Sequence, residues 1–146
     1  MITKITYPIQ CKVDNPVFLP IRAHDSDAGA DLTSAESITL YPGEQKMIDT
    51  GLAVKIPRGY GGFVFNRSSQ GKRGITIPNS VGVIDSGYRG NIKVILKNNG
   101  DDPYEIVEKV TRIAQLVIMP VSLCQFADSW NDAERGGGGF GSTDKT

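Results

Sequence analysis

Asp85 is the residue of this sequence with the clearest potential for chemistry. It lies in the segment 82–90, Gly-Val-Ile-Asp-Ser-Gly-Tyr-Arg-Gly. Residues 50–100 carry eight basic side chains, and Asp85 is their single acidic one. A carboxylate among cations stays ionised at neutral pH, and such a group can take a proton from water as a general base. The alternative is structural, because Asp-Ser-Gly between apolar runs is also typical of a hairpin turn.

A candidate phosphate site follows the apolar run 63–65, where Arg67 precedes Ser68 and Ser69. The N–H groups of a helix start beside an arginine bind phosphate, although Ser68 as a simple N-cap is the alternative. Gln115 lies inside an apolar segment, and a buried amide needs partners. We therefore expect Gln115 either to tie down backbone or to reach a ligand, whereas Asp31 taken alone indicates no more than a turn.

Charge and composition exclude several classes of protein. The 16 basic and 16 acidic side chains give zero net charge, which argues against direct binding of long nucleic acids. The longest apolar run, 116–119, is far short of the roughly 20 residues of a membrane span, and no apolar signal-peptide core follows Met1. We expect a cytoplasmic protein without a membrane partner, in the host cytoplasm if the chain is viral. Cys11 and Cys124 have no metal-ligand spacing, and the alternation around Cys11 predicts core packing.

Short apolar runs between frequent turns predict an all-β fold. The 17 glycines and 8 prolines are spread through the chain, and alternation of apolar and polar residues is the period of a half-buried strand. The expected strands span residues 5–13, 38–40, 52–56, 63–65, 75–77, 92–96 and 113–121. Residues 68–72 predict one helical turn. Many short strands with frequent turns are typical of a sandwich or barrel.

The C-terminal segment from Asp128 onward has a different composition. It is nearly devoid of apolar residues and rich in glycine, so it cannot bury a core of its own. One interpretation is a disordered terminus. The other is a phosphate-binding segment, because Gly-rich backbone presents N–H groups to phosphate oxygens and Arg135 can make bidentate phosphate contacts.

Five segments, in order and in spacing, resemble the five motifs of the homotrimeric dUTPases: residues 28–32, 66–74, 79–91, 112–121 and 134–143. The strongest matches are residues 82–90 and the run Arg-Gly-Gly-Gly-Gly-Phe-Gly-Ser-Thr at 135–143. The resemblance implies a distorted jelly-roll barrel in residues 1–127 and a C-terminal arm in residues 128–146. It also implies a homotrimer that hydrolyses dUTP to dUMP and pyrophosphate with Mg²⁺, each site being built from three subunits.

The resemblance also implies roles for single residues. Asp85 is similar to the base that activates the attacking water. Asn79 and the hairpin backbone, including Gly82 and Ile84, would read the uracil edge, and Tyr88 would pack under the deoxyribose. The residues similar to the family's phosphate ligands are Arg67, Ser68, Ser69, Gln115 and, in the arm, Arg135, Gly141, Ser142 and Thr143; Phe140 would stack on uracil. Asp31 would place the hydrated Mg²⁺ or hold a neighbouring cation.

The chain departs from the family pattern in the second motif. That motif usually begins with proline, where this chain has Asn66, and Gln70 and Gly71 stand where apolar or small residues are common. Two other functions compete with dUTP hydrolysis. A dCTP deaminase would need a glutamate near the hairpin, yet none lies between Glu44 and Glu105. A non-enzymatic, nucleotide-sensing or regulatory jelly-roll protein is the other, and an enzyme with a regulatory protein partner is also compatible with the sequence.

Overall fold

The computed structural model describes residues 8–130 and 137–141, which consist almost wholly of short strands and loops. The strands are β1 (Gln10–Val13), β2 (Ala30–Thr33), β3 (Ile38–Leu40), β4 (Gln45–Asp49), β5 (Leu52–Lys55), β6 (Tyr60–Phe65), β7 (Ile75–Thr76), β8 (Gly82–Ile84), β9 (Lys93–Asn98), β10 (Tyr104–Ile106) and β11 (Arg112–Pro120). A 3₁₀ turn, η1, spans Pro16–Phe18, and one helix, α1, spans Ser68–Lys72.

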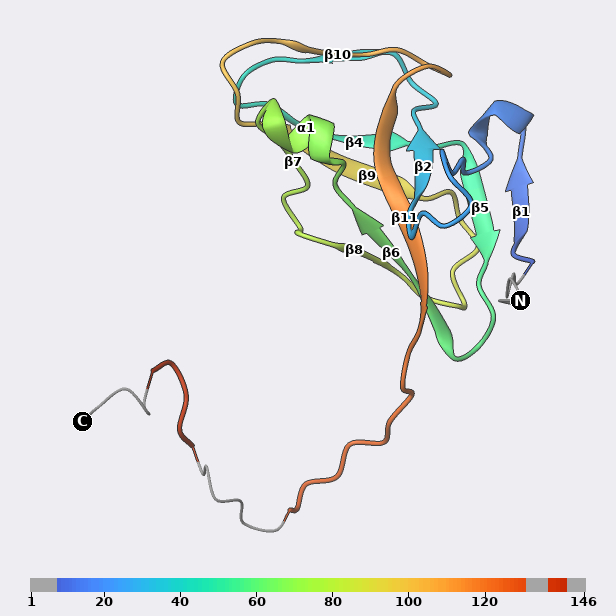
Figure 1. The fold of residues 1–146 in the computed structure, drawn as a ribbon, viewed down its shortest axis with the longest axis vertical. Helices are drawn as coiled ribbons and strands as arrows, with labels where there is room; N and C mark the ends of the chain where they lie inside the picture. The colour runs from blue at the N-terminus through green and yellow to red at the C-terminus, as the bar shows by residue number, and fades with distance from the viewer. Residues whose placement is uncertain (1–7, 131–136, 142–146) are drawn as a thin grey trace.

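The described strands pair into four small sheets around one core (Figure 1). The largest has the order β2-β11-β6-β8, with β11 antiparallel to both β2 and β6. Strands β4, β9 and β7 form the second sheet, while β1 pairs with β5 and β3 with β10. The central position of β11 matters for function, because it brings residues from distant parts of the chain side by side.

Alternating apolar residues of these strands build the core. In β9, for example, Val94 and Leu96 are buried while Lys93 points outward, as expected for a strand with one wet face. Fully buried side chains from the other sheets, such as Leu32 and Ile113, belong to the same cluster. The core therefore ties the sheets into one rigid body that can hold side chains on its rim.

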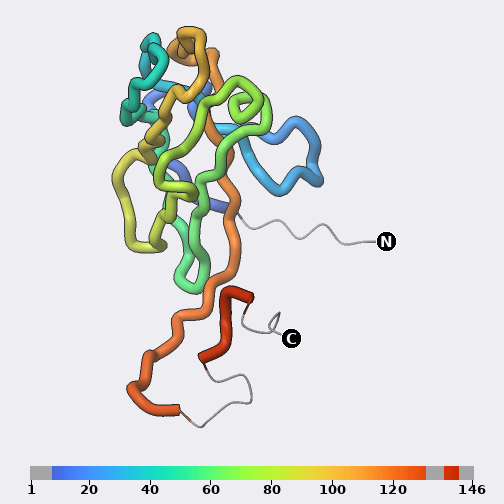
Figure 2. The backbone as a smooth tube through the Cα atoms, turned by 90° about the vertical axis from the view of Figure 1, so that its left-hand side faces the viewer, coloured from blue at the N-terminus to red at the C-terminus, as the bar shows by residue number. Residues whose placement is uncertain are grey.

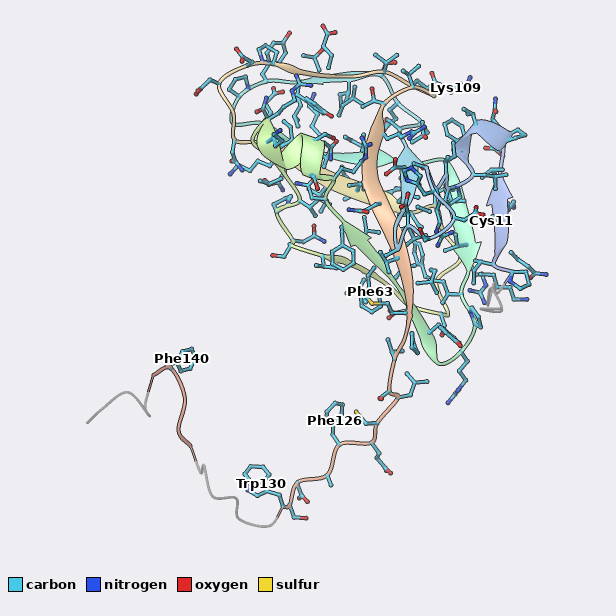
Figure 3. The ribbon with its side chains drawn as sticks, viewed as in Figure 1. Cys11, Phe63, Lys109, Phe126, Trp130 and Phe140 are labelled. Atoms are coloured by element: carbon cyan, nitrogen blue, oxygen red, sulfur yellow. The ribbon has the colours of Figure 1, made fainter. Side chains whose placement is uncertain are left out.

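Each predicted strand is found within the described residues, as β1, β3, β5, β6, β7, β9 and β11, and α1 has the predicted bounds. Strands β2, β4, β8 and β10 were not predicted, because each offers only two or three apolar residues to any pattern. The prediction for Cys11 is wrong. Its side chain is exposed on β1 (Figure 3), because β1 is paired only with β5 among the described strands.

Residues 121–130 have no regular secondary structure and extend away from the body of strands (Figure 2). Two large aromatic side chains of this segment, Phe126 and Trp130, are 92% and 88% exposed (Figure 3). No helix among the described residues is long and apolar enough to cross a membrane.

Candidate functional site

The residues predicted to bind phosphate lie near one another, beside strand β11. Gln115 is the register partner of Asp31 in β2 and also of Phe65 in β6. Arg67 follows Phe65 by two positions, after Asn66, and leads into α1. We name Asp31, Arg67, Ser68, Ser69 and Gln115 the β11 cluster, because the pairing of β11 brings all five to one end of the largest sheet.

Asp31 joins two arginines within this cluster. Its Oδ1 accepts a hydrogen bond of 3.1 Å from Arg67 Nε, and its Oδ2 accepts one of 3.1 Å from Arg112 Nη1. Arg67 Nη1 also donates to the backbone carbonyl of Arg112 at 3.1 Å. The Asp31 side chain is only 20% exposed, so these charge-assisted bonds are stronger than surface pairs. Arg112 is not among the predicted site residues; its place beside Asp31 depends on strand register.

Gln115 ties down backbone in this structure, the first of the two roles expected from its buried amide. Its Nε2 donates to the carbonyl oxygen of Asn66 at 2.8 Å, which fixes the start of the loop to α1. Arg67, rather than Ser68, occupies the N-cap position of α1, and it makes no side-chain capping bond. Ser68 and Ser69 are exposed in the first turn, so their hydroxyl groups face solvent beside the Arg67 guanidinium.

A second group of predicted residues surrounds β8. We name Asn79, Gly82, Ile84, Asp85 and Tyr88 the β8 cluster. The chain turns into β8 through Ser80, which has a φ of 66°, a left-handed conformation that costs energy for any residue except glycine. Two short backbone hydrogen bonds hold this turn, from Ser80 N to Ile77 O at 2.9 Å and from Val81 N to Asn79 O at 2.8 Å. The turn leaves Asn79 exposed.

Tyr88 is held in a defined position after β8. Its backbone N–H donates to the Asp85 carbonyl at 3.0 Å, and its hydroxyl donates to the Asn91 carbonyl at 2.9 Å. A Cβ at Gly90 would lie 2.6 Å from that hydroxyl oxygen, so a larger residue there would displace the Tyr88 ring. The Asp85 side chain is exposed in the same turn, where it can contact water.

The two clusters lie apart within one chain. Ile84 pairs with Gly62, near the middle of β6, whereas Arg67 lies just beyond the C-terminal end of that strand. Arg67 is five positions after Gly62, which corresponds to about 16 Å along a strand. Figure 1 shows the same arrangement, with α1 at the upper end of β6 and the loop that follows β8 toward its lower end. The predicted base and the predicted phosphate ligands therefore do not form one pocket in a single chain.

The remaining predicted residues belong to the C-terminal segment. Phe140 and Gly141 are described, and the Phe140 ring is fully exposed (Figure 3). Arg135, Ser142 and Thr143 lie outside the described residues, so their predicted contacts stay predictions.

Among the described residues, no group of three or more histidine, cysteine or carboxylate side chains can hold a metal ion.

The arrangement combines a carboxylate facing water, a tyrosine ring held by backbone and a cationic cluster with exposed hydroxyl groups. A family model described as dUTPase matches residues 15–144. The chain belongs to the dUTPase family, the class of enzymes that hydrolyse dUTP, and the predicted family is confirmed.

Curated relatives carry the name deoxyuridine 5'-triphosphate nucleotidohydrolase. The chain is 45% identical to the one of Leifsonia xyli subsp. xyli over 141 residues, covering 92% of both chains. It is 47% identical to the one of Cutibacterium acnes over 133 residues, covering 88% of this chain and 86% of the relative.

Solved structures of phage dUTPases have the same fold. A variant of the Staphylococcus phage 80alpha enzyme matches with a TM-score of 0.80 and 32% identity, covering 94% of this chain and 99% of that chain. The same phage enzyme was solved with dUpNHpp, and it matches with a TM-score of 0.77 and 33% identity over 94% and 98% of the chains. A variant from S. aureus phage phi11, reported to coordinate a structural Mg(II) ion, matches with a TM-score of 0.71 and 29% identity over 88% and 97%. These likenesses confirm the predicted all-β jelly-roll fold class.

Proposed function

We propose that this chain hydrolyses dUTP to dUMP and pyrophosphate, with Asp85 activating a water that attacks the α-phosphorus. The observation that carries this proposal is the pair of half-sites with complementary chemistry. Asp85 and Tyr88 follow Ile84, which pairs with Gly62, whereas Arg67 lies five positions farther along the chain and binds Asp31. Hydrolysis of this kind removes dUTP, which limits uracil incorporation into DNA and supplies dUMP for dTMP synthesis.

The separation of the half-sites supports a homotrimer with shared sites. A triphosphate extends only about 10 Å from its sugar, and catalysis needs the reacting atoms within about 3.5 Å of one another. This separation supports a site in which the β8 cluster of one chain meets the β11 cluster of another. Closed rotational symmetry gives every chain the same two contacts, so three copies make three equal sites.

The β8 cluster binds the nucleoside and supplies the base. Asn79 and the backbone of Gly82 and Ile84 pair with the uracil edge, in a turn too narrow for the 5-methyl group of thymine. The Tyr88 ring packs under the deoxyribose, where the 2′-OH of a ribose would clash. Asp85 accepts the proton of the attacking water, and no covalent intermediate is needed because the nucleophile is itself water.

The β11 cluster binds the phosphate chain. Arg67 keeps N–H groups beyond those bonded to Asp31 and Arg112, and Ser68, Ser69 and Gln115 add neutral contacts. Asp31 would help to hold a hydrated Mg²⁺, which when bound would supply positive charge to the triphosphate. Asp31 has lone pairs left for a metal-bound water, although both of its oxygens already accept from arginines.

Residues 128–146 act as an arm that closes over a neighbouring site, whereas residues 1–127 form the barrel. Arg135 contacts the γ-phosphate, Phe140 stacks on uracil, and Gly141, Ser142 and Thr143 bind phosphate oxygens. The full exposure of Phe140 in a single chain supports this role, since closure gives the ring a partner and excludes water from the reaction.

The proposed setting is the cytoplasm, with dUTP as substrate and no nucleic acid or membrane partner. A regulatory protein partner stays a prediction.

The deciding experiment measures pyrophosphate release by the purified, folded protein with Mg²⁺. We expect turnover of dUTP and far less of dTTP, dCTP or UTP, and an Asp85→Asn variant that binds nucleotide without turnover. Absence of dUTP turnover in folded protein refutes the proposal, and full turnover by Asp85→Asn removes Asp85 from the role of base.

A further inference from the structure

Gln70 is a polar side chain in a buried position of α1, where an apolar side chain of the same size would also fit. It lies on the inner side of α1 and is only 1% exposed. Its Nε2 donates to Asn66 Oδ1 at 2.9 Å and to the Ile113 carbonyl at 2.7 Å, and its Oε1 accepts from the Tyr104 hydroxyl at 3.1 Å. A buried amide is tolerated only when its hydrogen bonds are made, and here both ends of the amide are used.

Asn66, four residues earlier, is bound just as completely. Its Nδ2 donates to the Ile75 carbonyl at 2.8 Å, and its Oδ1 accepts from the backbone N–H of Arg67 at 2.9 Å as well as from Gln70. Its backbone carbonyl accepts from Gln115 at 2.8 Å. Asn66 therefore connects the buried amide of Gln70 to the peptide group of Arg67.

Arg67 is consequently fixed at both ends. Its peptide N–H is held by Asn66, and its guanidinium is held by Asp31 and by the Arg112 carbonyl. Tyr104 closes the network from the other side of α1, where the Arg73 guanidinium lies 4.6 Å from its ring centroid. Burial raises the pKa of Tyr104, although Arg73 and Arg67 oppose the rise, so its hydroxyl is protonated at neutral pH and donates to Gln70.

We propose that Gln70 and Asn66 act as a coupled pair of positioning residues, whose hydrogen bonds set the place of Arg67 and the first turn of α1 for binding the phosphate chain. The inference rests on the proposed function, in which Arg67, Ser68 and Ser69 contact phosphates. Its physical basis is that catalytic rate is sensitive to small displacements: a shift of about 1 Å at a binding group can lower the rate by about 100-fold. Asn66 and Gln70, two of the three unusual residues of this motif, then have one joint role.

The test compares Gln70→Met, which keeps the length of the side chain without its amide, with Asn66→Ala and the double variant. Lys72→Met is the matched control, because Lys72 is exposed on the same helix. Three measurements are made on each: kcat/KM for dUTP, affinity for dUpNHpp relative to dUMP, and hydrogen exchange of the Arg67 amide. We expect Gln70→Met to lower kcat/KM by about 10-fold to 100-fold, to weaken dUpNHpp binding more than dUMP binding, and to speed exchange at Arg67. The control should match the unmodified protein.

Coupling predicts that the double variant is no worse than the poorer single one. Effects that multiply in the double variant contradict the pair, and so does a Gln70→Met protein with unchanged affinity ratio and unchanged Arg67 exchange. If Gln70→Met fails to fold, the same three measurements are made on Asn66→Ala, because Asn66 is only half-buried. Failure of the unmodified protein to hydrolyse dUTP refutes the proposed function instead, and the exchange measurement still reports on the network.

Discussion

Mixed trimers provide the sharpest test of how the two clusters combine. Asp85→Asn removes the base of the β8 cluster, and Arg67→Gln removes a cation of the β11 cluster. Each variant alone should form trimers with little turnover. If a complete site takes its β8 cluster from one chain and its β11 cluster from a neighbour, the two defects fall on different sites in a mixed trimer. Some sites then receive both unmodified clusters.

The expected recovery follows from the geometry. In trimers assembled at random from equal amounts of the two variants, half of the chains bring an unmodified Asp85. At each site the neighbouring chain is chosen independently, and half of these neighbours carry an unmodified Arg67. About one quarter of all sites in the whole population are therefore complete. Trimers of a single variant have no complete site, whereas each mixed trimer has one complete site of three, so mixed trimers isolated through both tags should reach about one third of the turnover of the unmodified trimer. If both clusters of a site came from one chain, every site would carry a defect and recovery would be zero.

The assay uses co-expression of the two variants with different affinity tags, followed by two-step purification and measurement of pyrophosphate release from dUTP. The unmodified chain, expressed with the same two tags, sets full activity, and each variant expressed alone sets the background. Native mass spectrometry verifies that mixed trimers are present. Mixed trimers with no turnover above background would refute the shared site, because the roughly 16 Å between the clusters along β6 would then be bridged within one chain.

Three further predictions concern other parts of the site. Asp31→Asn should lower the free energy of unfolding by about 2 kcal/mol, measured by urea titration, because two charge-assisted hydrogen bonds to arginine are weakened; an unchanged midpoint would contradict this. Gly90→Ala should displace the Tyr88 ring and lower the preference for dUTP over UTP by about 10-fold, with kcat/KM for both nucleotides as the readout. Deletion of residues 134–146 should lower turnover while sedimentation still shows a trimer; dissociation into monomers would instead assign the arm a structural role.

Much of the fold follows from local pattern. Strand β9 contains the continuous apolar run Val94-Ile95-Leu96, and α1 begins and ends where the sequence predicts it. Strand β8, by contrast, has only three residues and is a strand because β6 lies beside it. Cys11 was assigned to the core by its alternation, yet that pattern does not indicate whether another sheet covers both faces of β1. Whether another sheet packs on a face of β1 is decided by the tertiary structure.

The sequence by itself determined the family, the residue types and their order, because five ordered motifs depend only on the chain. Asp85 as the single acid of residues 50–100 is visible in the same way. The tertiary structure decided which of these residues meet. The register of β11 places Gln115 opposite Asp31 and Phe65, and only that register brings Arg112 and Arg67 onto one carboxylate. Antiparallel pairing of β8 with β6 likewise holds Asp85 apart from Arg67, since strand direction and register are set by packing across the whole sheet.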